Sequence, residues 1–335
     1  MNDGKTLPKR ILIVKLSSLG DLFHALPAVH ELKTRCGADI DWAVQREYAD
    51  LARCFTDVNR VIRFPRRGFF RGLGTFLSDL RSVRYDMIVD LQGLLKSALV
   101  ARAARGGSRI GPSFHREGAR LFYNDVATGD SGRHAVERCL DTVRYLGLQP
   151  GKPVFPVDFP EVPVSQPAPR VAVLPVSRWP AKNWPLERFA EVIRLVRGRE
   201  KASFYLLGGN ADAAACRRVA EAAGGNDVVN TAGRLSPAET GGLLRRMDLL
   251  ISNDSGPVHM AAAVGTPVLV LFGPTDPGRT GPYGEGHRVV TSSVECRPCF
   301  SRVCRDRGGE CMKSISAGEV AAAALDILSA NSSRG

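Results

Sequence analysis

Short apolar runs alternate with stretches of helical periodicity along most of this chain. Residues 10–15 form a short apolar run rich in β-branched side chains, which predicts a strand. After a polar turn, apolar side chains recur at positions 22, 26, 29 and 32, which predicts a helix. Further strands are expected at 39–44 and 87–91, followed by an alanine-rich helix over 94–104. This alternation is typical of an α/β domain with a mostly parallel sheet.

A proline-rich stretch divides the chain. Seven prolines fall between residues 150 and 169, and proline sustains neither a helix nor a central strand. We therefore expect an amino-terminal domain over 1–160, a connector to about 169 and a carboxyl-terminal domain over 170–335, the two forming a ligand cleft at the carboxyl ends of their strands. In the second domain we expect strands at 170–174, 203–207, 249–252 and 268–272, helices at 185–197, 211–223 and 258–264, and a last helix at about 316–329.

The composition is that of an ordinary folded protein, with 44% hydrophobic and 24% charged residues. No apolar run approaches the ~18 residues of a membrane span, and the amino end lacks the ~7 to 15 apolar residues of a secretory signal. We therefore expect a cytoplasmic protein. The net charge of +12 favours an anionic partner. That charge alone allows a nucleic-acid-binding module, but no zinc-finger, RNP or helix-turn-helix signature accompanies it, so nucleic acid is not the expected partner.

Basic residues concentrate between positions 60 and 71. No acidic residue lies between Asp57 and Asp79, and arginines interleave with phenylalanines there. Such a segment suits an anionic lipid surface, where each basic residue contributes about 1 kcal/mol and aromatic rings seat among the headgroups. An ordinary solvated loop is the alternative. The residues concerned are Arg60, Arg63, Arg66, Arg67 and Arg71, with Phe64, Phe69 and Phe70.

Four of the eight cysteines lie within sixteen residues, with the spacing C-x2-C-x4-C-x6-C. In a reducing compartment, thiolates at such spacing can close a tetrahedral structural zinc site. The spacing differs from the usual paired C-x2-C arrangement, so free thiols or a redox-labile pair are alternatives. The four residues are Cys296, Cys299, Cys304 and Cys311.

The stretch 249–264 carries the most informative pattern. A buried strand is followed by a polar turn and then by Pro257, where a helix is expected to start. Free amides at that helix start, with the positive end of its dipole, suit a pyrophosphate. The alternative is that one polar residue caps the helix and the histidine is a satisfied core residue. The candidate ligands are Asp254, Ser255, Gly256 and His259.

Two more loops follow strands of the same predicted sheet, at 175–185 and 273–277. The first carries Ser177 and Lys182, and Lys182 supplies the cation that a diphosphate leaving group needs. A plain surface lysine is the alternative. A dinucleotide-binding turn is absent, since a single glycine, Gly20, follows the first strand. The stretch 147–152 resembles a P-loop but is one residue short and continues into Pro153 instead of Ser or Thr. Dehydrogenase and P-loop NTPase functions therefore lose their main support.

Asp21 and His24 lie three residues apart at the start of the first predicted helix, on one face of it. Asp21 could be a capping residue. It could instead accept a proton from an attacking hydroxyl.

In their order along the chain, these motifs resemble those of glycosyltransferase family 9, the heptosyltransferases of lipopolysaccharide core synthesis. The resemblance implies a GT-B fold, in which two Rossmann-like domains face a central cleft, with the acceptor domain first and the nucleotide-sugar domain second. It further implies metal-independent, inverting transfer of heptose from ADP-heptose to the Kdo and inner-core region of a lipopolysaccharide precursor, with no cofactor required. The matching segments are 11–27, 90–97, 177–184, 253–259 and 272–276.

Carried over residue by residue, the resemblance implies that Asp21 is the general base and Lys182 the lysine at the donor phosphates. The donor residues would be Ser177, Lys182, Asp212, Leu235, Asp254, Ser255, Gly256 and His259. The acceptor residues are expected to be Ser18, Gly20, His24, Arg63, Arg66, Arg67, Lys96, Arg116 and Arg120. The expected partners are ADP-heptose, a glycolipid of the Kdo-lipid A type and the cytoplasmic face of the inner membrane. A nucleotide-sugar epimerase of the same fold, or a family member with another donor or acceptor, is the alternative.

Overall fold

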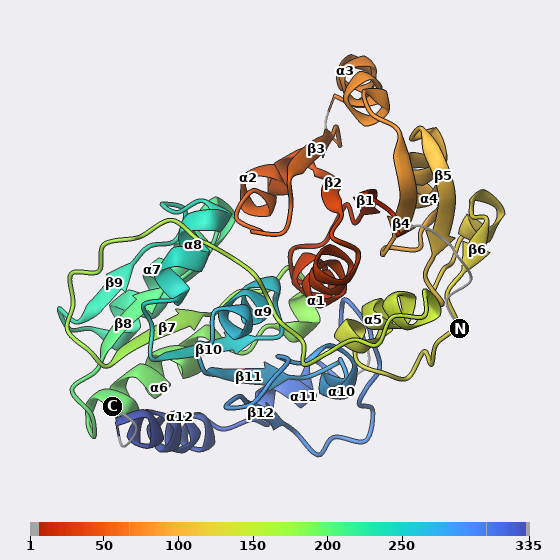
Figure 1. The fold of residues 1–335 in the computed structure, drawn as a ribbon. Coiled ribbons are helices and arrows are strands. Elements are labelled where there is room, and N and C mark those ends of the chain that lie inside the picture. The colour runs from red at the N-terminus through yellow and green to blue at the C-terminus, as the bar shows by residue number, and fades with distance from the viewer. Residues whose placement is uncertain (1–6, 67, 306, 333–335) are drawn as a thin grey trace. The chain divides into compact units, whose positions relative to one another are not determined.

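The computed structural model of this chain describes residues 7–66, 68–305 and 307–332. The chain forms two compact units that divide between Asp158 and Phe159. Each unit contains a six-stranded sheet within the described residues, and all of its paired strands are parallel (Figure 1). No helix in these ranges is both long and apolar enough to cross a bilayer.

The sheet of the amino-terminal unit has the strand order β3-β2-β1-β4-β5-β6. Its strands are β1 (Arg10–Val14), β2 (Asp39–Gln45), β3 (Arg60–Phe64), β4 (Tyr85–Asp90), β5 (Gly106–Gly111) and β6 (Asp125–Val126). Its helices are α1 (Leu19–Cys36), η1 (Arg46–Tyr48), α2 (Ala49–Ala52), α3 (Phe69–Arg81), α4 (Leu95–Ala103), η2 (Ala119–Phe122) and α5 (Ala135–Tyr145).

Alternating side chains of the central strands give this sheet a core on each face. On one face Leu12 and Val14 of β1 pack in the same cluster as Phe76 of α3 and Val100 of α4. On the other face α1 packs along α5 (Figure 1). Helix α1 ends at Gly37, whose φ of 62° is a left-handed conformation that favours glycine.

The sheet of the carboxyl-terminal unit has the order β12-β11-β10-β7-β8-β9. Its strands are β7 (Arg170–Leu174), β8 (Ser203–Leu206), β9 (Val228–Asn230), β10 (Leu249–Asn253), β11 (Val268–Phe272) and β12 (Arg288–Thr291). Its helices are η3 (Pro180–Lys182), α6 (Leu186–Arg197), η4 (Asn210–Asp212), α7 (Ala213–Ala223), α8 (Pro237–Leu244), α9 (Gly256–Ala263), α10 (Pro277–Thr280), α11 (Glu310–Lys313) and α12 (Ala317–Ser332). Strands β10 and β11 are buried along their whole length, as expected for parallel strands covered on both faces.

The predicted strands and helices are confirmed, with ends that differ by a few residues, but the basic segment 60–71 differs from both expectations for it. Its first half is not a loop, because Arg60–Phe64 forms edge strand β3. Phe64 is buried and packs edge to face on Phe76, with ring centroids 5.3 Å apart. Arg60 donates hydrogen bonds to Asp41, Ser82 and Tyr85. These two residues were therefore wrongly assigned to a lipid-facing surface.

Candidate active site

In the carboxyl-terminal unit, the loops after β7, β10 and β11 meet at the carboxylate of Asp254. Its Oδ2 atom accepts hydrogen bonds from Lys182 Nζ at 2.5 Å and from Thr275 Oγ1 at 2.6 Å. The hydroxyl of Ser177 donates to the carbonyl oxygen of Asp254 at 3.3 Å. The predicted convergence of these three loops is confirmed. Thr275 was not predicted, because nothing in the local sequence distinguishes it from an ordinary turn residue.

Lys182 is not a plain surface lysine. Its side chain is 14% exposed and that of Asp254 is 6% exposed, so the two charges form a buried ion pair. The ammonium also lies 4.6 Å from the centroid of the Trp179 ring, and the guanidinium of Arg302 lies 5.2 Å from the same ring. Both cations are placed to interact with the negative face of the indole.

Asn253 fixes the backbone around this ion pair. Its side chain accepts a hydrogen bond from the amide of Trp184 at 3.1 Å and donates one to the carbonyl of Pro175 at 2.8 Å. The amide of Ser177 donates to Asn183 Oδ1 at 2.7 Å. The loop that carries Lys182 is therefore held at both ends by the side-chain amides of Asn253 and Asn183.

Helix α9 begins directly after the Asp254 turn. Ser255 precedes the helix in an extended conformation and makes no capping hydrogen bond, and Pro257 occupies the first turn. Asp254 is engaged by Lys182 and Thr275. The capping interpretation is therefore wrong for both residues, and the positive end of the helix lies beside the buried ion pair. His259 is buried on the same helix.

Two predicted donor residues lie at the other half of the same sheet edge. Asp212 follows β8 and accepts a hydrogen bond from the amide of Gly209 at 2.9 Å. Leu235 is half-buried between β9 and α8. Because β8 and β9 lie on the opposite side of β7 from β10 and β11, the predicted donor residues are spread along one continuous edge.

In the amino-terminal unit, Asp21 lies in the first turn of α1. Its Oδ2 atom accepts hydrogen bonds from the amide of Ser18 at 2.8 Å and from the hydroxyl of Ser18 at 2.7 Å. His24 Nδ1 lies 3.7 Å from Oδ1, and the Asp21 side chain is 45% exposed. Asp21 thus uses Oδ2 to bind Ser18 at the start of the helix, and its Oδ1 faces His24.

The pKa of Asp21 lies well below its usual range. Burial by itself would raise this pKa, but the polar contact with His24, the positive charges of Lys15 and His24, and the amide of Ser18 outweigh burial. The carboxylate is therefore ionised throughout the neutral range.

A side-chain network fixes the loop that leads into α1. Gln92 Oε1 accepts hydrogen bonds from the amides of Leu16 at 2.7 Å and Ser17 at 3.3 Å. Asp90 Oδ1 accepts from the amides of Gln92 and Gly93, and Tyr123 donates its hydroxyl to Asp90 Oδ2 at 2.7 Å. Burial raises the pKa of Asp90 despite these donors. The segment 90–97, singled out by its resemblance, thus positions the turn before Asp21.

The other predicted acceptor residues lie around the carboxyl edge of this sheet. Gly20 and His24 are buried in α1, and the His24 ring lies edge to face on His134 with centroids 5.6 Å apart. Lys96 lies 5.7 Å from the Phe64 centroid, and its pKa is lowered by burial and by the charge of Arg66. Four of the predicted cations are exposed, namely Arg63, Arg66, Arg116 and Arg120, and Arg67 lies outside the described residues.

The chain matches the model of glycosyltransferase family 9 (heptosyltransferase) over residues 74–308. It is 32% identical to lipopolysaccharide heptosyltransferase 1 of Pseudomonas aeruginosa, over 88% of this chain and 87% of that protein. The corresponding protein of Escherichia coli K12 is 30% identical, over 85% of this chain and 94% of its own.

The chain belongs to glycosyltransferase family 9.

Solved structures agree with this family membership. The E. coli heptosyltransferase WaaC with ADP superposes with a TM-score of 0.79 at 27% identity, over 95% of this chain and 99% of that one. A family 9 glycosyltransferase from Veillonella parvula has the same fold, with a TM-score of 0.83 at 21% identity over 97% and 98% of the two chains. The GT-B fold and the glycosyltransferase class, both implied by the resemblance, are confirmed.

The cysteine cluster of this family 9 member does not form the zinc site considered from its spacing. Cys296 and Cys299 are exposed, whereas Cys311 is buried in α11. Among the residues that the structure describes, no group of three His, Cys, Asp or Glu side chains is arranged to hold a metal ion. Burial raises the pKa of the Cys311 thiol, and the other three cysteines raise it further. The four cysteines therefore lie near one another but are not arranged as the ligands of a metal ion.

The cysteine segment instead packs on the donor-site loops. The amide of Phe300 donates to the carbonyl of Pro274 at 2.8 Å, and the amide of Ala181 donates to the carbonyl of Arg302 at 3.1 Å. This segment therefore braces the loops after β7 and β11. This role could not be predicted from the sequence, because backbone groups make both contacts.

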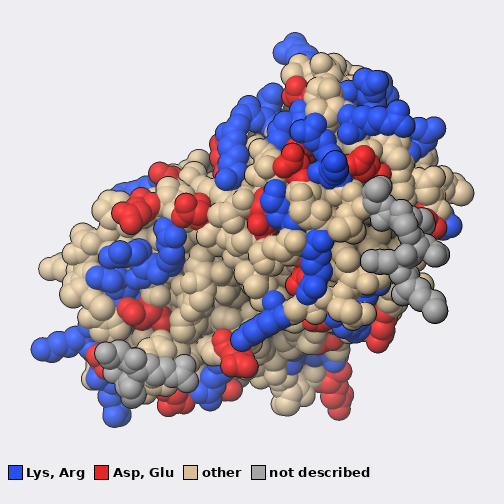
Figure 2. Space-filling view, viewed as in Figure 1, with Lys and Arg blue, Asp and Glu red and all other residues tan. Residues whose placement is uncertain are grey.

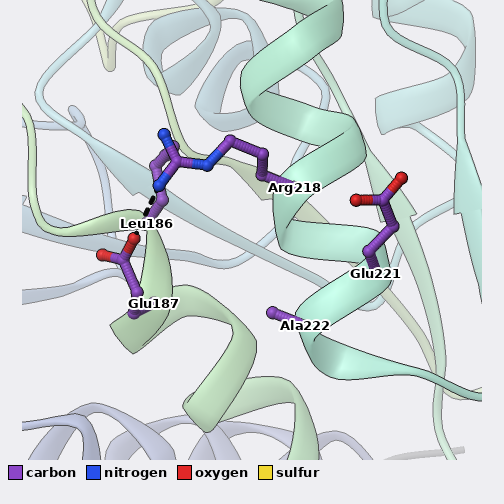
Figure 3. A pocket seen from close by; sticks show the side chains of 5 residues that line it. All are labelled: Leu186, Glu187, Arg218, Glu221 and Ala222. Carbon is purple, nitrogen blue, oxygen red and sulfur yellow. Dashed lines mark hydrogen bonds and ion pairs between the residues drawn. The ribbon is translucent and has the colours of Figure 1, made fainter.

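A cavity between α6 and α7 is a poor candidate for the donor site (Figure 3). It is lined by Leu186, Glu187, Arg218, Glu221 and Ala222. Arg218 is paired with Glu187 at 2.9 Å, which leaves the carboxylate of Glu221 to repel a phosphate. None of the predicted donor residues lines this cavity.

Proposed function

We propose that this family 9 glycosyltransferase transfers heptose from ADP-heptose, with inversion, to the Kdo and inner-core region of a lipopolysaccharide precursor. The observation that carries the proposal is the buried cation of Lys182 beside the start of α9. A fixed cation and free helix amides are the groups that bind and stabilise a diphosphate. The names of the relatives, lipopolysaccharide heptosyltransferase 1, support the choice of sugar and acceptor.

Residues along the edge of the carboxyl-terminal sheet would bind the donor. Lys182 and the amide of Gly256 at the start of α9 would hold the diphosphate, with Ser177 and His259 beside it. Asp212 and Leu235, at the ends of β8 and β9, would receive the ribose and the adenine. Solved WaaC with ADP supports ADP as the nucleotide of a relative.

Asp21 would act as the general base. As the acceptor hydroxyl oxygen bonds to the anomeric carbon, its proton passes to Asp21 and the bond from that carbon to the phosphate oxygen breaks. The electron pair leaves with ADP, whose added charge is stabilised by Lys182 and α9. Attack on the face opposite the leaving group inverts the configuration. Because the Asp21 side chain is 45% exposed, solvent can take the proton afterwards.

The acceptor would be a glycolipid of the Kdo-lipid A type on the cytoplasmic face of the inner membrane. Figure 2 shows Lys and Arg side chains gathered around the α3 end of the amino-terminal unit. Phe70 of α3 and Leu121 of η2 are exposed by 91% and 85%. Exposed apolar side chains among cations suit an anionic bilayer surface. The cations are Arg63, Arg66, Arg71, Lys96, Arg116 and Arg120.

The test is incubation of the protein with ADP-heptose, with and without the glycolipid acceptor. Release of ADP that depends on the acceptor supports transfer. A changed sugar nucleotide in the absence of acceptor would instead indicate epimerisation, and no reaction with a Kdo-bearing acceptor would refute the proposed acceptor.

A further inference from the structure

The ammonium of Lys15 is a buried charge at the end of β1. The residue is 6% exposed, and Lys15 Nζ donates a hydrogen bond to the carbonyl of Leu91 at 2.7 Å. That is its one hydrogen bond within the described ranges, and no carboxylate there lies within 4.0 Å of it. An ammonium has three donors, so two of them have no protein partner in the part of the chain described.

Such an arrangement is costly unless a ligand completes it. Burying a charge with a single hydrogen bond carries a desolvation penalty, and the carboxylate of Asp21, whose pKa the charge of Lys15 lowers, offsets it only from beyond ion-pair distance. The backbone of Lys15 is itself fixed, because its carbonyl accepts a hydrogen bond from the Trp42 indole at 3.0 Å and its amide donates to Ala43. The side chain is therefore held in place with unused donors, as expected of a residue that binds an anion.

A second cation lies close to Lys15. Both cations lie over the ring of Phe114, with Lys15 Nζ 5.9 Å and the Arg138 guanidinium carbon 4.2 Å from its centroid. Lys15, Arg138, Asp21 and Asp141 all act electrostatically on the buried thiol of Cys139, so both cations and both carboxylates belong to one charged neighbourhood. The Asp21 side chain is 45% exposed, so the proposed base is open to solvent.

We infer that Lys15 and Arg138 bind a carboxylate of the acceptor sugar acid and so set its reacting hydroxyl against Asp21. Two cations beside one carboxylate leave a net positive charge, which also favours a second anionic group of the acceptor. Carboxylates form strong, directional hydrogen bonds with ammonium and guanidinium groups. Neither cation was predicted from the sequence. The inference rests on the proposed function, since it takes the acceptor from it.

The experiment compares the Kdo-bearing acceptor with its carboxamide derivative. In the natural enzyme the carboxamide should raise the acceptor KM roughly ten- to a hundredfold, the range for a hydrogen bond to a charged group. In Lys15→Met the two acceptors should have similar, high KM values, while the KM for ADP-heptose stays unchanged. An equal carboxylate preference in both proteins would overturn the inference.

Two further variants keep the test decisive. Arg138→Met should lower the carboxylate preference in the same way. It replaces Lys15→Met in the experiment if thermal unfolding shows that Lys15→Met is not folded. Arg84→Met removes an exposed cation of the same unit and should leave the preference intact. Calorimetric binding of both acceptors without donor repeats the comparison without turnover. Absence of acceptor-dependent ADP release in the natural enzyme would refute the proposed function, whereas transfer with no carboxylate preference would refute this inference alone.

Discussion

Lys182 Nζ lies 2.5 Å from Asp254 Oδ2, and both side chains are largely buried. The chain thus carries its own anion against the cation that we assign to the donor diphosphate. Thr275 shares the same carboxylate oxygen, so the charge of Asp254 stays solvated by protein groups if Lys182 turns to a ligand. The ion pair keeps the ammonium of Lys182 in place without using all three of its hydrogen-bond donors.

Lys182→Ala should weaken ADP binding and lower turnover, because a cation beside a departing diphosphate acts in both the ground and the transition state. It should also destabilise the fold, by up to about 3 to 5 kcal/mol, since Asp254 would be left without its counter-ion. Isothermal titration with ADP, steady-state kinetics and thermal unfolding measure the three effects.

The double variant Lys182→Met/Asp254→Asn separates the two roles of this pair. It removes both charges, so the unfolding temperature should largely recover while ADP affinity and turnover stay low. Recovery of activity together with stability would mean that Lys182 serves only the fold.

Asp21→Asn should bind ADP-heptose normally but lose about 10² to 10⁴ in kcat, the usual contribution of a general base. Asparagine caps a helix about as well as aspartate, and its oxygen can still accept from Ser18, so stability should change little. Donor binding by calorimetry and turnover with saturating acceptor are the measurements. Retained turnover would reduce Asp21 to a structural role at the helix end.

The activity should show no acidic limb from Asp21 in the neutral range. Its folded-state pKa is lowered, mainly by His24 and Lys15 acting against burial, so the carboxylate loses its charge only below the ordinary value of about 3.9. The stability that the ionised form contributes is therefore present above that value and is lost as the pH falls through the lowered pKa. In Lys15→Met one lowering cause is gone, and the acidic limb of kcat/KM should move upward. An identical pH profile for this variant would contradict the electrostatic link.

Turnover should survive chelation. Lys182 and the amides of α9 supply the positive charge that a divalent ion would otherwise bring to the diphosphate. Initial rates with EDTA, and again after addition of Mg²⁺, should agree. A strict requirement for Mg²⁺ would show that these groups do not suffice.

Reversal of three exposed cations, Arg63→Glu, Arg66→Glu and Arg71→Glu, should abolish binding to vesicles with anionic lipid and raise the acceptor KM. Each basic residue near such a surface is worth about 1 kcal/mol. ADP affinity should stay unchanged. The matched control reverses three cations that are exposed in the other unit, Arg199, Lys201 and Arg217. Equal vesicle binding by both variants would show that the membrane contact lies elsewhere on the protein.

Local patterns were sufficient to predict the α/β alternation and the three loops of the donor edge. The carboxyl ends of parallel strands share one edge, so residues as distant as Lys182 and Asp254 could be expected near each other. Strand β3 was missed as a strand because its arginines obscure the alternation of Phe64 and Ile62 with exposed positions.

The contacts that position the amino-terminal site could not be read from the sequence. Tyr123 and Asp90 are 33 residues apart, and Gln92 reaches Leu16 across 76. Lys15 looked only like the polar end of an apolar run. The structure shows that Lys15 is almost fully buried and that its ammonium has a single hydrogen-bond acceptor among the described residues. Neither property can be read from the local sequence.

The side chain of Gln92 also occupies backbone amides in the turn between β1 and α1. Three successive amides there, from Leu16, Ser17 and Ser18, already donate to side chains of the chain itself. The last of these acceptors is the carboxylate of Asp21, which adds a negative charge where a dinucleotide-binding turn would receive phosphate. The amino-terminal unit thus keeps the strand-turn-helix plan of a nucleotide-binding domain while its turn is closed to phosphate. One architecture is thus used twice in a single chain, and in the amino-terminal half a glutamine and an aspartate occupy the amides that a nucleotide-binding turn would offer to phosphate.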